Sequence, residues 1–290
     1  MLGIVFAIGA LVFWGFGDFF IQKTTREIGI FKTMFFIGLV AILGLFPFVK
    51  TELSIVFQRP ETFIILGLAA VVAFLTAIFD FKALKEGKIA VVEPIIGMEL
   101  PITVILGVTL AHEQLSALQY IIIFAIFIGI VLAITVNHKH LHYHKRIFEK
   151  GVVMALFGAI GMALTNFLIG TSSQLVSPLM VIWFIHGMLA VFTFVYLLTS
   201  GQFKSLYQNL KKYPKTIITQ SVLDNAGWLS FASATTLLPI SITTSISESY
   251  IILASLLGIY VNREKLKRHQ KIGIALAATG IIIMAAITAG

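Results

Sequence analysis

Six acidic residues stand inside long apolar stretches of the sequence, where an ionised side chain is costly. They are Asp18, Asp80, Glu93, Glu99, Asp224 and Glu248, and no Lys or Arg lies deep in the same stretches. A charge at the centre of a bilayer costs from a few to about 10 kcal/mol or more, so such groups face a cavity or a partner. A buried carboxyl can bind a cation, or it can take up and release a proton, because loss of water favours its neutral form. These residues therefore predict a site for a cationic solute or a proton.

Helical spacing selects two of these acids. In the stretch 88–110, Glu93 and Gly97 are four residues apart and share one helix face. In the stretch 240–261, one face carries Ser241, Thr244, Ser245 and Glu248. We expect both faces to line a transport cavity, with Glu93, Thr244 and Glu248 at the solute or proton. The alternative for Ser and Thr is a hydrogen bond between helices.

Four further residues are candidates for the same site. Asp224 and Trp228 are one helical turn apart, and a Trp beside an acid could form a wall for a cation or an aromatic solute. Trp228 could instead anchor the chain at the membrane interface. The first spans correspond more loosely than the repeat described below, with Gly9–Thr24 on Leu156–Ser172 at a similar offset. This places Asp18 on the uncharged Asn166, so only one of this pair can take a proton or a cation.

The remaining polar residues of the apolar stretches carry weaker expectations. Asp80 lies close to Lys82 and Lys85 and is expected to form a local ion pair. Glu99 points away from the face of Glu93 and is harder to assign. His186 is interpreted as a hydrogen-bonded packing residue, with titration near neutral pH as the alternative.

The elements that position these residues are helices long enough to cross a bilayer. The chain has 290 residues, of which 58% are hydrophobic and 12% charged, about half the charged fraction of a soluble protein. A span needs about 20 mostly apolar residues. The segments that qualify are 2–21, 31–49, 62–81, 88–110, 117–136, 151–170, 176–199, 215–236, 240–261 and 270–289. We predict an all-α membrane protein with ten transmembrane helices.

The basic residues orient these spans. All but two of the 21 Lys and Arg fall in the connections on one side of the predicted membrane, and the exceptions are Lys50 and Arg59. Basic connections stay in the cytoplasm. We therefore expect a protein of the cytoplasmic membrane, with both termini outside the cell and the segment 138–150 in the cytoplasm.

The chain contains one long segment twice. A shift of 151 positions lays residues 81–133 on residues 232–284 without a gap. The matched residues include Gly107 with Gly258, Glu113 with Glu264, Gln119 with Gln270 and Gly129 with Gly280. A shared helical period would not align these polar residues and glycines. The sequence predicts two five-helix halves, 1–137 and 151–290, joined by a basic His-rich connector, 138–150.

An odd number of spans in each half inverts the second half in the membrane. Inverted repeats are typical of transporters, with a site near the midplane where the halves meet. Pro94, Gly97 and Pro101 predict a break in span four, for which a packing kink is the alternative. Glu113 and Glu264 are expected to cap the turns into spans five and ten, with a gating role as the alternative.

At this point the chain resembles the EamA-type drug/metabolite transporters. The resemblance lies in Trp14-Gly15, in Glu-x-Leu after spans four and nine, and in the stretch from Met98 through Glu113 and Gln119 to Gly129. It covers essentially the whole chain, although Ile252 stands where the first half has Pro101. It implies a transporter fold and leaves the substrate open, because the family carries amino acids, sugars, nucleotide sugars and other metabolites.

Several other functions are not expected. The sequence contains no G-x-x-x-x-G-K-[ST], no H-E-x-x-H and no G-x-S-x-G, so neither ATP drive nor hydrolytic chemistry is predicted. No cofactor, resident metal or nucleic acid is expected. The alternating residues His138, His140, His142 and His144 could bind a metal ion, but a basic connector beside anionic lipid is the simpler interpretation.

Together these observations predict a secondary active transporter working by alternating access, coupled to protons through intramembrane carboxyls. The expected partners are a small metabolite such as an amino acid or similar polar solute, protons and membrane lipid, with the chain a monomer or a homodimer. The alternatives are an exporter of lipophilic cations and, third, a membrane-embedded enzyme.

Overall fold

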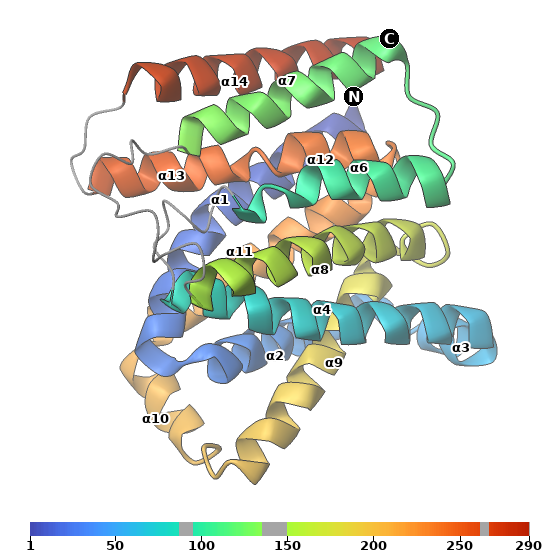
Figure 1. The fold of residues 1–290 in the computed structure, drawn as a ribbon. Helices are drawn as coiled ribbons and strands as arrows, with labels where there is room; N and C mark the ends of the chain where they lie inside the picture. The colour runs from blue at the N-terminus through green and yellow to red at the C-terminus, as the bar shows by residue number, and fades with distance from the viewer. Residues whose placement is uncertain (87–94, 135–149, 262–266, 290) are drawn as a thin grey trace.

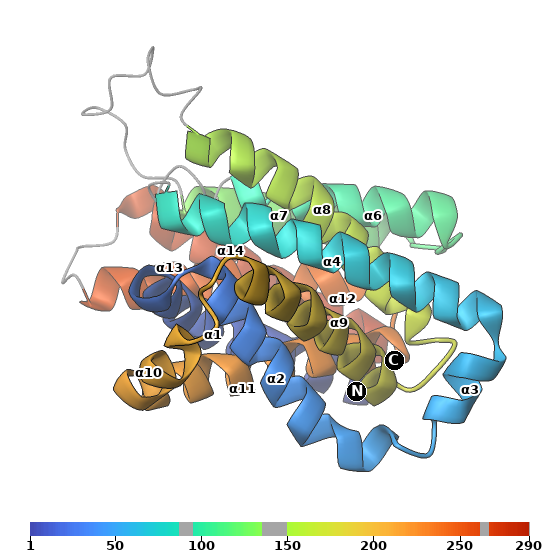
Figure 2. The ribbon, with the colours of Figure 1, turned by 90° about the horizontal axis from the view of Figure 1, so that it is seen from below.

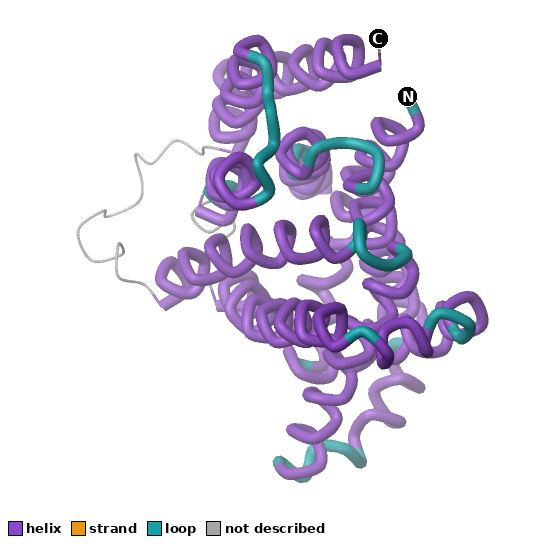
Figure 3. The backbone as a smooth tube through the Cα atoms, turned by 90° about the vertical axis from the view of Figure 1, so that its right-hand side faces the viewer, coloured by secondary structure: helices purple, strands orange, loops and turns teal. Residues whose placement is uncertain are grey.

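All regular structure in the described part of the chain is helical (Figure 3). The structure, a computed structural model, describes residues 1–86, 95–134, 150–261 and 267–289. The helices are α1 (Leu2–Ile28), α2 (Ile30–Val49), α3 (Leu53–Gln58), α4 (Pro60–Glu86), α6 (Glu99–Leu110), α7 (Ala117–Ile134), α8 (Lys150–Ser172), α9 (Pro178–Thr199), α10 (Ser205–Lys212), α11 (Pro214–Thr235), α12 (Ile240–Ser247), α13 (Tyr250–Val261) and α14 (Arg268–Ala289).

The outer faces of these helices are apolar, as they must be in contact with lipid. On α1, for example, Val5, Ile8, Val12 and Phe16 point outward on one stripe and are each at least 38% exposed. Within the described ranges, six helices are long and apolar enough to cross a membrane: α1, α2, α4, α8, α9 and α14. The helices α6, α7 and α12 with α13 are shorter apolar segments, and α11 carries the polar residues Gln220, Asp224 and Asn225. The count of ten spans therefore stays a prediction.

The contacts between the two halves of the chain are symmetric: replacing each helix by its repeat counterpart gives the same set of helix pairs. The repeat lays α1, α2, α4, α6 and α7 on α8, α9, α11, α13 and α14. The most extensive contacts are α1 with α11, α4 with α8, α2 with α9, and α7 with α14. Exchange of the halves turns the first pair into the second and leaves the last two unchanged. Figures 1 and 2 both show α4 beside α8 and α7 beside α14. The halves are thus interleaved.

Two of the predicted spans are broken at the same repeat position. A turn at Gly97 and Met98 precedes α6, and a turn at Glu248 and Ser249 separates α12 from α13. The shift of 151 positions lays the first turn on the second. In the second half the break occurs without a proline, among side chains such as Ser245 and Ser249 that bond to their own backbone, Ser249 Oγ donating to Ser245 O at 3.2 Å. Broken helices of this kind occur where backbone lines a cavity.

Other matched residues of the repeat hold equivalent structural positions. Gln119 Oε1 accepts from Ser116 N at 2.8 Å at the start of α7, and Gln270 Oε1 accepts from Lys267 N at 2.9 Å at the start of α14. These bonds satisfy backbone donors that a helix leaves free. At Gly129 an added Cβ would lie 2.7 Å from the backbone nitrogen of Ala277, so glycine lets α7 and α14 approach closely.

The two ends of the molecule differ. The chain termini, α3 and the connection from α6 to α7 lie toward one end, on the right in Figure 1, and we call it the α3 end. At the opposite end lie α10 and the connection from α1 to α2. The sequence around that connection carries Lys23, Arg26 and Lys32. We call this end the basic end.

Candidate functional site: an acidic cavity between the halves

A cavity of about 80 Å³ lies where the two halves meet. The first half lines it with Trp14, Asp18, Ile21, Ile37, Ala73, Thr76, Ala77, Asp80, Phe81 and Glu99. The second half lines it with Met162, Thr165, Asn166, Ile169, Ile185, His186, Leu189, Asp224, Trp228, Glu248 and Tyr250. Many of these are repeat counterparts of one another, such as Asp18 and Asn166, or Glu99 and Tyr250. The cavity therefore lies near the axis that relates the halves.

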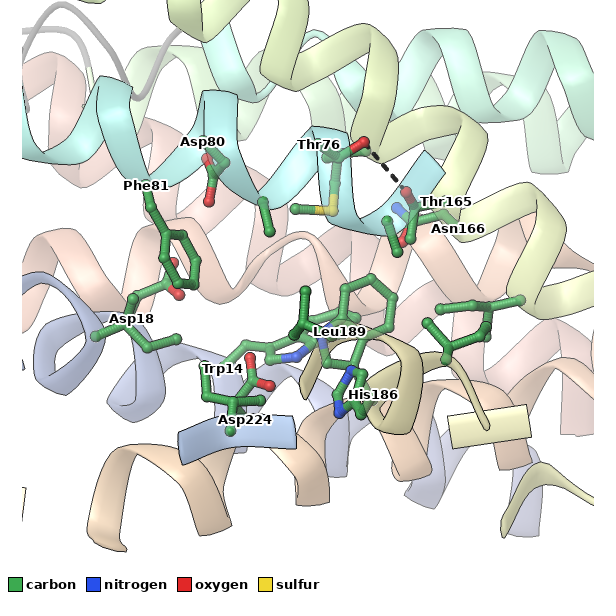
Figure 4. Close-up of a pocket in the computed structure, with 18 of the residues that line it drawn as sticks. Trp14, Asp18, Thr76, Asp80, Phe81, Thr165, Asn166, His186, Leu189 and Asp224 are labelled. Carbon is green, nitrogen blue, oxygen red and sulfur yellow. Dashed lines mark hydrogen bonds between the residues drawn. The ribbon is translucent and has the colours of Figure 1, made fainter. Parts of the chain in front are cut away.

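Five carboxyl groups share this space, and none of its lining residues is Lys or Arg. Figure 4 shows Asp18, Asp80 and Asp224 around the same opening, each from a different helix. Asp80 was expected to pair with Lys82 or Lys85. Instead it lines the cavity, and it makes no ion pair with either lysine in the described part of the chain. A space with this lining attracts cations and repels anions.

The predicted site residues divide into three groups. Asp18, Asn166, Asp224, Trp228 and Glu248 come together in the cavity. Thr244 is fully buried on α12 and does not reach the lining. Glu93 lies outside the described residues, as do Glu264 and the His138–His144 run. The roles predicted for these residues stay predictions.

Glu248 stands in the turn between α12 and α13, and its carboxyl is held by Asn166 on α8 of the same half. Its Oε1 accepts from Asn166 Nδ2 at 3.4 Å. The Glu99 carboxyl lies near the Glu248 carboxyl in the lining of the same cavity. Both side chains are buried, but no described residue donates a hydrogen bond to either oxygen of Glu99 or to Oε2 of Glu248. If both carboxyls were ionised, these oxygens would have no partner. One proton held between the two carboxyls would supply the missing bond and remove their repulsion.

Aromatic rings form the floor of the cavity beside the acids. Trp14 packs edge-on to Trp228 at 4.8 Å and to Tyr250 at 5.7 Å between ring centroids. An added Cβ at Gly227 would lie 2.5 Å from Trp14 Nε1, so this glycine makes room for the ring. Trp228 lines the cavity, and its role as a wall for a solute stays a prediction. Rings next to carboxyls are a favourable surface for an organic ammonium group.

The tautomer of His186 follows from its hydrogen bonds. Asn225 Nδ2 donates to Ile37 O at 3.0 Å and to Ser221 O at 2.7 Å, so its Oδ1 is left to accept. His186 Nδ1 lies 2.8 Å from that oxygen and must therefore carry the proton. His186 Nε2 then holds a lone pair. The ring is both a packing residue, as expected, and part of the cavity lining.

Comparison of the sequence with protein families identifies the family to which this chain belongs. The model of the EamA-like transporter family matches the chain twice, over residues 1–135 and 149–286. The chain belongs to the EamA-like transporter family. With its apolar helices, this makes it a multi-pass membrane protein.

Two further comparisons bear on the EamA-like chain. A solved crystal structure of a protein with 12% sequence identity has the same fold, with a TM-score of 0.74 over 99% of this chain and 97% of the other. A comparison of the sequence with curated proteins finds no match.

Some residues of the EamA-like cavity were not predicted as part of the site. Glu99 and Asp80 were assigned elsewhere, and Thr76 and Thr165 were not considered. Thr165 Oγ1 donates to Thr76 Oγ1 at 3.4 Å across the cavity wall (Figure 4). The repeat offered a signal for Glu99, because its counterpart Tyr250 follows Glu248 by two residues.

Replacing Asn225 by Ala should destabilise the EamA-like fold and release the His186 ring. The change leaves His186 Nδ1–H without its acceptor, which costs about 1–3 kcal/mol for a buried group, and it removes the additional bond of Asn225 to Ile37 O. Thermal unfolding in detergent would show a lower melting temperature. Asn209→Ala, on the half-exposed α10, is the matched control and should leave it unchanged. An unaltered melting temperature in Asn225→Ala would contradict the bonding described here.

Proposed function

We propose that the chain is a secondary active transporter that moves a small polar metabolite, such as an amino acid or a similar amine, by alternating access. The observation that carries this proposal is the cavity between the interleaved halves, with five carboxyls and no basic residue in its lining. The ten predicted spans, with the second half inverted, would place it near the membrane midplane. The charge asymmetry favours a cytoplasmic location for the basic end.

The coupling ion is proposed to be the proton. Glu99 and Glu248 lie together at the two helix breaks, one in each half, with no basic residue in the lining to neutralise them. A carboxyl pair that shares one proton can release that proton when a cationic solute enters the cavity. The same acids would take the place of water around the ammonium group of that solute.

Export of lipophilic organic cations is the second candidate function. The cluster of Trp14, Trp228 and Tyr250 beside the acids favours it. The volume favours a small solute instead, because pockets for drug-sized ligands begin at about 300 Å³. A membrane enzyme is the third candidate, and no observation on the cavity favours it.

Solute flux into proteoliposomes separates these candidates. With an imposed pH gradient, we expect accumulation of a small amine-bearing solute and no chemical change in it. Solutes are first selected by thermal shift over amino acids, sugars and organic cations, since a ligand of the folded state raises the melting temperature. Net accumulation that ignores the pH gradient would contradict proton coupling. Chemical conversion without net movement would contradict transport.

A further inference from the structure

Glu113 makes a contact that joins the two halves at the α3 end. It follows α6 in the first half, and its carboxylate accepts bonds from Ile240 N, from Ser241 N at 3.1 Å and from Ser241 Oγ. These donors are the first residues of α12 in the second half. The sequence interpretation gave Glu113 the turn into α7, but Gln119 caps that helix. Glu113 instead caps a helix whose far end carries Glu248 in the cavity.

The backbone around Glu113 is built for this contact. His112 adopts a left-handed conformation, with φ 54°, and Glu113 N donates to Gly107 O at 3.1 Å. The chain therefore turns back over the end of α6. A Cβ at Gly107 would lie 2.5 Å from Glu113 Oε2 and 2.7 Å from Ser241 Oγ, so only glycine leaves room for the carboxylate there. This gives a reason for glycine at position 107.

A second carboxylate of the first half makes a similar contact at the same end. Glu52, just before α3, accepts from Ser177 Oγ at 2.8 Å and from Ser177 N at 3.3 Å. Ser177 is the N-cap of α9, since its Oγ accepts from Met180 N at 3.2 Å. Negative groups are favoured at helix N-termini. Both halves are thus tied together at the α3 end by carboxylates of the first half.

The burial of the cavity residues matches this asymmetry. Toward the α3 end, Asn166 and Ile169 on α8 are at most 1% exposed. Toward the basic end, Asp18, Ala77 and Asp80 are half-buried. Ile21 and Phe81 toward the basic end are 3% and 8% exposed, so the lining is more exposed there only at some positions. The α3 end, where the carboxylate contacts lie, is the more completely buried side. Separation of the halves there would have to break them.

We propose that Glu113 is the latch that closes the cavity at the α3 end, and that it releases Ile240 and Ser241 when solute exchanges at that end. The latch rests on the proposed function, because a closed and an open end have meaning only in alternating access. Breaking it shifts the population toward a state open at the α3 end.

Single cysteines test the latch directly, because the chain contains none. Ile169→Cys reports on the α3 side of the cavity and Ala77→Cys on the basic side, with the protein in lipid nanodiscs and a charged, water-soluble maleimide as reagent. Glu113→Ala should raise the labelling rate of Ile169→Cys by about tenfold. Loss of one charge-assisted hydrogen bond changes the equilibrium between the closed and the open state by about this factor. Gly107→Ala should act in the same direction, and Ser241→Ala less strongly. Labelling of Ala77→Cys should fall.

Glu61→Ala is the matched control, because Glu61 is an exposed acid at the same end and should leave both labelling rates unchanged. Equal labelling of Ile169→Cys with and without Glu113 and Gly107 would overturn the latch. A rise at both Ile169→Cys and Ala77→Cys would also overturn it, since that result means a loosened fold. Labelling needs no solute, so its failure is distinguishable from a failure of flux in the wild-type protein.

Discussion

Glu99→Gln and Glu248→Gln should each reduce proton-driven accumulation to the level of empty vesicles. An amide cannot release a proton, so either change removes one member of the pair proposed to hold the coupling proton. Both residues are buried and stand at equivalent helix breaks, one in each half. The measurement is uptake into proteoliposomes with and without an imposed pH gradient, using a solute identified by thermal shift.

Exchange of solute across the membrane without a gradient separates coupling from folding. Glu99→Gln should retain this exchange, because the Asn166 contact that positions Glu248 is intact in that variant. Its exchange rate should also lose most of its dependence on pH. Glu61→Gln, which changes an exposed acid outside the cavity, should accumulate solute as the wild type does. Normal accumulation in either cavity variant would show that the proton is held elsewhere.

Composition and the internal repeat were enough to predict most of the fold. Apolar segments of about 20 residues predicted where the helices lie, and the match of Gly129 with Gly280 predicted equivalent positions in paired helices. The family comparison confirms the resemblance to EamA-type transporters. Asp18 and Asp224 could be predicted as site residues because an ionised side chain in lipid is costly at any position along the chain.

Glu99 could not be placed correctly, because its assignment assumed a continuous helix. Glu99 follows Glu93 by six residues, which is about 240° around an unbroken helix, on nearly the opposite face. The turn at Gly97 and Met98 resets this phase and directs Glu99 toward Glu248. Helical spacing predicts faces only within one uninterrupted helix. Helical spacing holds for Thr244 and Glu248, because Glu248 N still donates to Thr244 O at 2.8 Å and the second break begins only at Glu248.

The partner of Glu113 was beyond sequence reasoning for a different reason. A carboxylate near the start of a helix suggests a local cap, and nothing in the spacing distinguishes that helix from one 127 residues away. The decision depends on Gly107, whose missing side chain opens a path across α6 to Ser241. Such a contact is set by packing between the halves, which follows from the fold as a whole.

Gly38→Ala and Gly44→Ala should change stability in opposite directions, although both lie in α2. A Cβ at Gly38 would lie 2.7 Å from the backbone nitrogen of Ala190 and would press on the carbonyl of His186, so α9 must move. Overpacking of this kind costs about 1–3 kcal/mol. A Cβ at Gly44 meets nothing within 4 Å, and there alanine should stabilise the helix by up to about 1 kcal/mol. Thermal unfolding in detergent measures both.

The same pair of variants tests how the fold positions the cavity. Displacement of α9 by Gly38→Ala moves His186, which lines the cavity and takes its orientation from Asn225. Solute affinity should therefore fall in Gly38→Ala and stay unchanged in Gly44→Ala. If the two variants had equal melting temperatures, the close approach of α2 and α9 would be wrong. If Gly38→Ala lost stability but kept its affinity, His186 would serve packing alone.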